Sequence, residues 1–558
     1  MRKEVQIICE NTGNRHILQP GMSLMEIAKH LKIELSNPIL GAMVNNELKE
    51  LEYEVYSPKN IRFIDITHAE GMRIYQRSLF FVLQKAVRDI LPNATVRFEH
   101  AVSKGFYCEI DGCTVPIELP LIFRIGDRMR EIIAADMPFR HDKMLTTDAI
   151  KLFEQLGYTD KAKLFSSRPK LYSSVYFLDD MADYFFGCLA PSTGYLKVFD
   201  LVKYYQGMLL MIPKRRKPNE LEDIVIQNKM FDIFQEYKDW VDILGVGSIA
   251  AINEQVKAGG ASELIKISEA LHEKKVGQIA DMITSRKNGE GVRLVLISGP
   301  SSSGKTTFAK RLSIQLKVTG LKPYTISLDN YFVDREKTPL DEHGEYDFES
   351  IHALDIDKFN EDMVLLLNGE EVEIPKFSFE QGKRFYDGTK MQIEPHGIII
   401  LEGIHALTPE LTHKIPNKQK FKVYVSALTS LSIDGINRIP TTDNRLIRRI
   451  TRDYKYRAYS ALDTIRRWES VRRGEDHNIF PYQEEADVMF NSALLFELGV
   501  LKRYVEPILR ELPPNVPEYA ESTRLLKFLS NISPIPDEDI PPTSILREFL
   551  GGSTFSYK

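Results

Sequence analysis

The sequence predicts a multidomain chain of α/β and α+β type, with an N-terminal β-grasp domain, a central α+β domain and a C-terminal α/β domain built on a parallel sheet. A length of 558 residues suits about three to five domains. Short β-rich runs fill residues 1–66, and from Val292 onward apolar strands alternate with helical segments as in βαβ units. The expected regions are 1–66, 67–219, 220–290, 291–510 and a C-terminal tail, 511–558.

The composition excludes several classes of protein. Apolar residues make up 43% of the chain and charged residues 27%, which excludes wholesale disorder. The 73 Lys and Arg side chains nearly balance the 78 Asp and Glu side chains, so no global field would hold nucleic acid or an anionic membrane. Four scattered cysteines argue against a disulfide framework, and no run approaches the ~18 apolar residues of a membrane span. We therefore expect a cytoplasmic protein.

The first 66 residues are expected to form the β-grasp domain. Ser23 and Glu26 have the spacing of a capping box, which predicts the start of a helix. The adjacent Asn45 and Asn46, between apolar flanks, predict a tight turn. Together with β-rich runs at 5–9, 39–44 and 60–66, these signals indicate a small sheet with one helix.

Mixed strand and helix patterns predict the α+β domain that follows. Apolar residues recur at helical spacing from 79 to 90 and stop at Pro92. Further strands are expected at 94–102 and 105–111, and further helices at 127–137 and 146–157. Residues 220–290 are almost wholly helical in pattern, with a break at Gly259 and Gly260, so they should form a helical connector. The proline-rich tail is expected to be extended, and either docked on the body or partly loose.

Residues 299–307 carry the first chemical motif. They read GPSSSGKTT and fit G-x-x-x-x-G-K-[ST] between an apolar strand and a helical pattern, a setting that a simple glycine-serine turn does not explain. Glycines let successive backbone N–H groups point into one cavity at a helix N-terminus, where they favour anionic oxygens. We expect Lys305 to reach the β- and γ-phosphates of a nucleotide and Thr306 to ligate Mg²⁺. The expected nucleotide-binding residues are Gly299, Pro300, Ser301, Ser302, Ser303, Gly304, Lys305, Thr306 and Thr307.

Two acidic residues close later apolar runs, where ligands collect in an open α/β sheet. Glu402 closes GIIILE and suits a carboxylate that holds Mg²⁺ directly or through water. Asp329 closes YTISLD and suits a base that accepts the proton of an attacking hydroxyl. Strand-end acids also serve as caps or salt-bridge partners, but a phosphate loop in the same sheet favours the functional interpretation. The expected metal site comprises Thr306, Glu402 and Asp329.

A basic segment follows between residues 445 and 473, where ten of 29 residues are Arg or Lys against three acids. On a helix Arg445, Arg449 and Arg452 would form one cationic face without compensating carboxylates. A charge run is often only a solvated face. Because a triphosphate must be held and its transition-state charge stabilised, a lid over the phosphates is the favoured interpretation.

Several of these segments resemble the uridine kinase and phosphoribulokinase group of P-loop kinases. The segments are GPSSSGKTT, SLDNYF, YDFESIHALD, IIILEGIHAL and DNRLIRRITRD, in the same order as in that group. The resemblance implies Mg²⁺-dependent transfer of the ATP γ-phosphate to the 5′-hydroxyl of a nucleoside, as in nucleoside salvage. It also implies that Asp329 is the catalytic base and that Arg449, Arg452 and Arg457 belong to the lid.

The chain departs from this group where a pyrimidine base is read. At the place of a Tyr-Asp-Phe segment and a histidine it has Phe377-Ser378-Phe379 and Gly382, so the polar partners of the base are missing. Glu349 stands where the group has an aspartate near the sugar, and Tyr331-Phe332 reverses the usual order. The base therefore stays open. A kinase of another sugar-type small molecule and an ATP-dependent regulatory or RNA-binding protein are the alternatives.

The first half of the chain resembles a TGS domain over residues 1–66 and the editing domain of threonyl-tRNA synthetase over 67–219. The similar segments include MPFRHDKMLTTDAIKLFEQLG, ATVRFEHAVSKGFYCEID and STGYLKVFDL. The positions that match the editing residues of that domain are Arg77, Phe81, Phe185 and Leu189. None of the four can replace the histidines and cysteine of a hydrolytic site, so editing is not expected. Residues 214–217, Lys-Arg-Arg-Lys, would suit RNA phosphates or be simply solvated, and a homo-oligomer is also possible.

Overall fold

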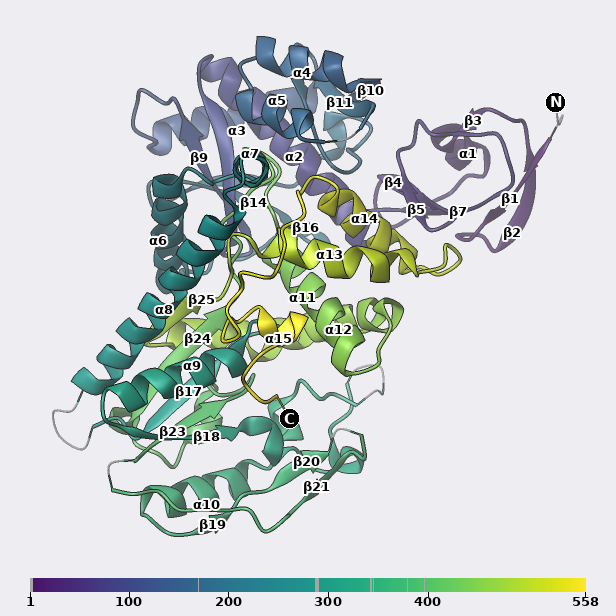
Figure 1. Ribbon diagram of the computed structural model, residues 1–558. Coiled ribbons are helices and arrows are strands. Elements are labelled where there is room, and N and C mark those ends of the chain that lie inside the picture. Colours follow the sequence, from purple (N-terminus) through teal and green to yellow (C-terminus); the bar gives the residue numbers. More distant parts are fainter. Residues whose placement is uncertain are drawn as a thin grey trace.

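The computed structural model describes residues 4–168, 170–286, 291–341, 344, 346–378, 380–395 and 397–557. A small N-terminal domain lies to one side of an α+β domain, and the C-terminal α/β domain lies at the opposite end of the molecule (Figure 1). The last segment of the chain runs back between them (Figure 1). Within the described ranges, no helix has both the length and the hydropathy needed to cross a membrane.

The N-terminal domain is a sheet with one helix. Its elements are β1 (Val5–Cys9), β2 (Asn14–Leu18), β3 (Met22–Ser23), α1 (Leu24–His30), β4 (Gly41–Val44), β5 (Glu47–Lys49), β6 (Glu54–Val55) and β7 (Lys59–Ile64). The strand order β2-β1-β7-β4-β5, with β1 and β7 parallel, confirms the β-grasp prediction. The capping box at Ser23 and Glu26 is present, and Asn45 and Asn46 turn the β4–β5 hairpin with positive φ.

The α+β domain is built around a long buried helix, α2. Its elements are α2 (Ala69–Ile90), β8 (Thr95–Val102), β9 (Gly105–Asp111), α3 (Leu119–Ala134), β10 (Arg140–Leu145), α4 (Thr146–Gln155), α5 (Thr159–Ser166), β11 (Tyr172–Leu178), β12 (Met181–Asp183), β13 (Asp200–Tyr204), β14 (Gly207–Met211), β15 (Pro213–Lys214) and β16 (Lys217–Leu221). The strands form antiparallel sheets of order β13-β14-β9-β8 and β10-β11-β12. The predicted strands and helices of this region are thus present, with the helix expected at 79–90 forming the second half of α2.

Three connecting helices lead to the C-terminal domain: α6 (Asn228–Leu244), α7 (Ile249–Lys257) and α8 (Ala261–Ser285). The predicted break falls between α7 and α8, where Gly259 has a φ of +86°. A left-handed backbone of this kind favours glycine. The predicted helical pattern is therefore present from residue 228 to residue 285, whereas Lys217–Leu221 form β16.

The C-terminal domain has a parallel sheet of order β18-β23-β17-β24-β25. Its elements are β17 (Leu294–Ser298), α9 (Lys305–Val318), β18 (Lys322–Ser327), α10 (Ile356–Leu367), β19 (Val372–Glu373), β20 (Lys376–Ser378), β21 (Lys383–Phe385), β22 (Lys390–Met391), β23 (Gly397–Glu402), β24 (Lys420–Ser426), α11 (Thr441–Tyr456), α12 (Ala461–Asn478), β25 (Val488–Asn491) and α13 (Glu497–Arg510). Val295 and Ile297 pack with α9 and α11, whereas Leu294 and Leu296 face the side of α10 and α6. Because β17 is the middle strand of this order, the loop that follows it emerges from the centre of the sheet.

The prediction of an extended tail needs correction. The tail is docked but not simply extended, because it forms α14 (Tyr519–Leu529) and α15 (Arg547–Leu550) and buries Phe528 and Phe549 in the core. The basic loop at 214–217 is part of the β15–β16 hairpin. Its cations have acidic neighbours: Lys214 bonds Asp223 at 3.1 Å and Arg215 bonds Glu469 at 2.8 Å. Acidic neighbours therefore offset part of the positive charge of this hairpin.

Buried ion pairs join the halves of the molecule. Arg524 on α14 binds Asp443 on α11 through both terminal nitrogens, at 2.7 and 2.8 Å. The neighbouring Glu521 accepts a hydrogen bond from Arg73 on α2 at 3.0 Å. Truncating one partner of such a network leaves a buried charge uncompensated, so these contacts fix the position of α11 relative to the α+β domain.

Candidate active site

The loop after β17 has the geometry of a phosphate cradle. It spans residues 299–304, and α9 starts at Lys305 with Gly304 in the left-handed region at φ +85°. A Cβ on Gly299 would lie 1.9 Å from the carbonyl oxygen of Val425 on β24, so only glycine fits there. The first N–H groups of a helix have no partner within the helix. The helix itself thus leaves the N–H groups of its first turn without a partner at the carboxyl edge of the sheet, where other acceptors can bind them.

Lys305 is folded back on this loop. Its Nζ donates hydrogen bonds to the carbonyl oxygens of Gly299 at 2.8 Å and Pro300 at 3.1 Å. Burial lowers the pKa of Lys305, and the carboxylates of Glu402 and Asp329 oppose this effect. An ammonium group that carries a desolvation cost gains from a nearby phosphate, which supplies further negative charge.

The predicted metal-binding oxygens converge beside the loop. β18 and β23 pair in parallel with Ser327 opposite Glu402, so the acids at the two strand ends lie close together. Glu402 accepts hydrogen bonds from the hydroxyls of Ser327 at 3.0 Å and Thr306 at 3.4 Å. These are hard oxygen donors of the kind that Mg²⁺ prefers, and that ion keeps several waters rather than needing a full protein cage. The residues present therefore fit Mg²⁺.

The charges of the two strand-end acids affect each other. Burial raises the pKa of Glu402 to about 7, and the neighbouring Asp329 adds to this rise. The pKa of Asp329 is also raised, because the surrounding protein desolvates it, although Lys305 and Arg457 lower it. The structure thus places Asp329 close enough to Glu402 and Lys305 for their charges to interact, and Glu402 in turn contacts Thr306.

The arginines of α11 contact the loop, but they do not lack acidic partners. Arg445, buried, pairs with Glu475, while Arg449 pairs with Asp453 at 3.3 Å. Arg452 and Arg457 also lie within 2.7 and 3.7 Å of Asp453. The predicted absence of compensating carboxylates is therefore wrong: the cationic face is organised around acids from α11 and α12.

Contacts from α11 to the loop are direct. Arg449 Nη1 donates to the Ser301 hydroxyl at 2.8 Å, and Arg445 Nε donates to the Ser301 carbonyl at 2.9 Å. Arg448, fully buried, binds Glu497 on α13 and the Ser492 carbonyl. Arg445 and Arg449 thus reach the phosphate loop at Ser301, whereas Arg448 donates to the Ser302 carbonyl at 3.4 Å and also ties α11 to α13.

Sequence reasoning missed several residues that shape the loop. Glu475 on α12 accepts a hydrogen bond from the Ser301 N–H at 3.0 Å, and Ser492 contacts the Ser303 carbonyl at 2.5 Å. Arg448 and Glu497 also belong to this group. Nothing in the local sequence identifies them, because Arg448, Glu475 and Ser492 meet the loop from 146, 174 and 189 positions away in the chain, and Glu497 acts through Arg448.

The residues at the place where the resembled group reads a pyrimidine base lie on and beside β20 and β21. The Phe377 ring stands 5.5 Å from that of Phe332, and the Gly382 carbonyl accepts a hydrogen bond from the Arg335 N–H at 2.8 Å. Tyr331 is buried and its hydroxyl bonds Asp362 at 3.2 Å. Phe379, expected in this region, lies outside the described residues.

Glu349 lies beside α12. A Cβ on Gly474 would come within 2.4 Å of the Glu349 Cβ, so the two chains are in close contact. Burial raises the pKa of Glu349 to about 7, and Glu475 adds to it. Near pH 7 this side chain can therefore be neutral and act as a hydrogen-bond donor.

The four positions that match editing residues lie together in the α+β domain, but as an apolar cluster around one cation. The Phe81 and Phe185 rings are 5.4 Å apart, and Leu189 is buried. Arg77 Nε donates to the Cys188 carbonyl at 3.0 Å. In the parts of the chain that the structure covers, no cluster of three or more His, Cys, Asp or Glu side chains could hold a metal. These side chains offer no group for hydrolysis.

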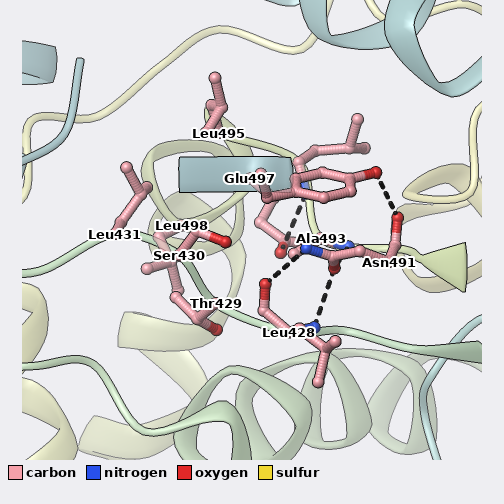
Figure 2. Close-up of a pocket in the computed structure, with 11 residues that line it drawn as sticks. Leu428, Thr429, Ser430, Leu431, Asn491, Ala493, Leu495, Glu497 and Leu498 are labelled. Atoms are coloured by element: carbon pink, nitrogen blue, oxygen red, sulfur yellow. Dashed lines mark hydrogen bonds between the residues drawn. The ribbon is translucent and has the colours of Figure 1, made fainter. Parts of the chain in front are cut away.

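A small cavity lies between the ends of β24 and β25 (Figure 2). The Asn491 carboxamide oxygen accepts hydrogen bonds from the backbone N–H groups of Leu428 and Ala493, both at 2.9 Å, and Tyr237 bonds the Asn491 carbonyl. Its volume of about 10 Å³ has room for no more than one water molecule. It is not a substrate pocket.

A phosphate loop at the centre of a parallel sheet, with acids at two neighbouring strand ends and arginines against the loop, defines a P-loop kinase domain. Residues 294–495 match the model of the Phosphoribulokinase / Uridine kinase family. The model covers none of the residues before 294.

The N-terminal region is similar to threonine–tRNA ligases, in agreement with the predicted TGS and editing-like domains. The enzyme of Methylobacillus flagellatus is 29% identical over 200 residues, which are 35% of this chain and 31% of that enzyme. The enzyme of Clostridium kluyveri is 25% identical over 262 residues, 46% of this chain and 39% of that enzyme. The chain therefore spans well under half the length of these relatives.

Two solved structures are also similar. The first is described as a "Possible Uridine Kinase from Bacillus stearothermophilus", with 19% identity and a TM-score of 0.26, covering 39% of this chain and 98% of that one. D-glycerate 3-kinase from Cryptococcus neoformans has 13% identity and a TM-score of 0.19, covering 49% of this chain and 88% of that one. TM-scores this low carry no argument about substrate.

Proposed function

We propose that the C-terminal domain is an ATP-dependent nucleoside kinase, which transfers the γ-phosphate of ATP to the 5′-hydroxyl of a nucleoside. The observation that carries this proposal is the convergence of a phosphate loop, an Mg²⁺-compatible group of oxygens and a strand-end acid. Glu402 lies within hydrogen-bond distance of Thr306, and its pKa responds to the charge of Asp329. A reaction that proceeds by positioning and charge stabilisation needs these parts.

In the proposed reaction the acceptor oxygen forms a bond to the γ-phosphorus while the bond to the bridging oxygen of ADP breaks. Asp329 accepts the proton that leaves the acceptor hydroxyl. Lys305 turns from the loop carbonyls to the phosphate oxygens, and the loop N–H groups hold the phosphates. Mg²⁺, when bound by Thr306 and Glu402, with Asp329 nearby, would neutralise phosphate charge.

We assign the lid role to Arg449, Arg452 and Arg457. Arg449 already contacts Ser301, while Arg452 and Arg457 are held beside Asp453. We propose that all three donate to phosphate oxygens as negative charge develops in the transition state. Arg445 and Arg448 are buried and ion-paired, so their role is to hold α11 against its neighbouring helices.

The acceptor base remains a separate proposal. Phe377 and Gly382 offer a ring face and a backbone but no polar side chain to a pyrimidine edge. This composition favours a base or another planar group that is recognised by stacking. A sugar-type acceptor other than a nucleoside is the second candidate, and it is favoured because Phe377 and Gly382 lack the polar side chains that would bind a base edge.

A screen of purified full-length protein separates these candidates. ADP release would be measured with Mg²⁺-ATP and each of a panel of purine and pyrimidine nucleosides and free sugars. We expect turnover with at least one nucleoside and a product phosphorylated at the 5′ position. Turnover with sugars alone would favour the second candidate. Intact ATP binding without turnover of any acceptor would contradict both and favour an ATP-dependent regulatory protein.

A further inference from the structure

The end of the tail is docked on the phosphate loop. We define the strap as residues 544–557, which include α15. A carboxylate oxygen of Glu548 accepts hydrogen bonds from the Thr307 hydroxyl at 2.6 Å and the Thr307 N–H at 3.3 Å. The hydroxyl of Tyr557 lies 2.9 Å from the same Thr307 hydroxyl. Two side chains of the strap therefore contact Thr307 in the first turn of α9.

The strap also covers the last glycine of the loop. A Cβ on Gly304 would lie 2.6 Å from Cγ2 of Ile545, so the two residues are in direct contact. Ile545 is fully buried, and the Arg448 guanidinium lies 5.1 Å from the Phe549 ring. Lys455 of α11 donates a hydrogen bond to the Leu550 carbonyl. The strap is thus held by the same helix that carries the lid arginines.

Glu548 binds a backbone donor of the kind that holds nucleotide phosphates in a phosphate loop. Thr307 is the third residue of α9, so its N–H is one of the donors that the helix itself cannot satisfy. In a phosphate loop these donors hold the α- and β-phosphates of a nucleotide. Gly304, as the residue before the helix, supplies no side-chain cap. An anionic oxygen from the strap therefore sits where an anionic oxygen of a nucleotide would bind.

The negative charge of Glu548 also supports the interpretation that it takes the place of a phosphate. Glu548 is close enough to Lys305 for its negative charge to favour the protonated ammonium, as a phosphate would. A carboxylate and a phosphate cannot share the Thr307 N–H, and two anions at one site repel each other. Nucleotide binding should then require Glu548 to leave α9.

We propose that the strap is an autoinhibitory element, in which the Glu548 carboxylate takes the place of a nucleotide phosphate at Thr307 and is displaced when a nucleotide binds. The free protein is then an equilibrium between a closed form with Glu548 on α9 and an open form that binds nucleotide. The observed dissociation constant exceeds the intrinsic one by the inverse of the open fraction. This inference rests on nucleotide binding by the loop and not on the identity of the acceptor.

The test is ADP binding to full-length Glu548→Gln, measured by calorimetry at saturating Mg²⁺. Glutamine keeps an oxygen for Thr307 but loses the charge, and charged hydrogen bonds are about twice as strong as neutral ones. We expect the dissociation constant of ADP to fall about three- to tenfold. Glu538→Gln, at an exposed position of the same tail, is the matched control and should bind ADP as the wild type does.

Other outcomes would overturn the proposal. An unchanged dissociation constant would make Glu548 a helix cap only, and weaker binding would make it part of the nucleotide site. ADP binding to neither protein would overturn the proposed function as well. As a second measurement, saturating ADP should speed hydrogen exchange in the strap of the wild-type protein. Unchanged or slower exchange there would contradict displacement.

Discussion

The raised pKa of Glu402 predicts that nucleotide binding releases protons. With a pKa of about 7, roughly half of the Glu402 carboxyls are protonated in the free protein at pH 7. A carboxylate that holds Mg²⁺ must be ionised, so binding of Mg²⁺-ADP should release about 0.5 proton at pH 7, about 0.9 at pH 6 and about 0.1 at pH 8. Below pH 7 the affinity for Mg²⁺-ADP should therefore fall.

Calorimetric titrations in two buffers with different ionisation enthalpies measure this number. The Glu402→Gln protein is the control, because it keeps the shape of the side chain and cannot release a proton from it. The difference between the two proteins isolates Glu402 from protons released by ADP itself. Equal proton release by both proteins at pH 6 and pH 7 would refute the assignment of Glu402 to the metal site.

Three further changes test other parts of the site. In the free protein the pKa of Glu402 lies above its ordinary value of 4.5, so the folded form binds this proton more tightly than the unfolded form. Between pH 5 and pH 8 the wild type should therefore lose roughly 2–3 kcal/mol of stability relative to Glu402→Gln. Thermal scans measure this loss, and parallel stability curves of the two proteins would contradict it. Arg448→Ala should lower the free energy of unfolding by about 3–5 kcal/mol in denaturant titrations, because Glu497 would stay buried without its partner. The control, Arg510→Ala at an exposed position, should change it by less than about 0.5 kcal/mol. Equal losses in the two variants would refute the buried pair. Thr306→Ala should raise the Mg²⁺ concentration for half-maximal activity about tenfold or more, and Thr306→Ser should restore it; an unchanged requirement would remove Thr306 from the metal site.

Local signals were sufficient for most of the fold. The capping box at Ser23, the turn at Asn45 and the strand before Gly299 each place a strong chemical preference at one point of the chain, and each is found in the structure. The same is true of Asp329 and Glu402, because parallel strands bring their carboxyl ends to one edge of a sheet.

The rest depends on long-range packing, which no local pattern reveals. Asp453 is visible in the sequence, but only the turn of α11 shows that it faces three arginines. Glu475 and Glu548 reach the loop from distant elements, and their contacts decide how the loop N–H groups are occupied. The prolines of the tail predict an extended chain. The structure instead forms α14 and α15 there, and both helices bury apolar residues.

The proposed mechanism depends most on Asp329 as the base of phosphoryl transfer. The direct measurement is single-turnover kinetics of Asp329→Asn with the acceptor that the screen identifies, together with the dissociation constant of ADP. We predict that phosphoryl transfer slows by about 100-fold or more while the ADP dissociation constant changes by less than about threefold. An unchanged rate of transfer would contradict the proposed mechanism.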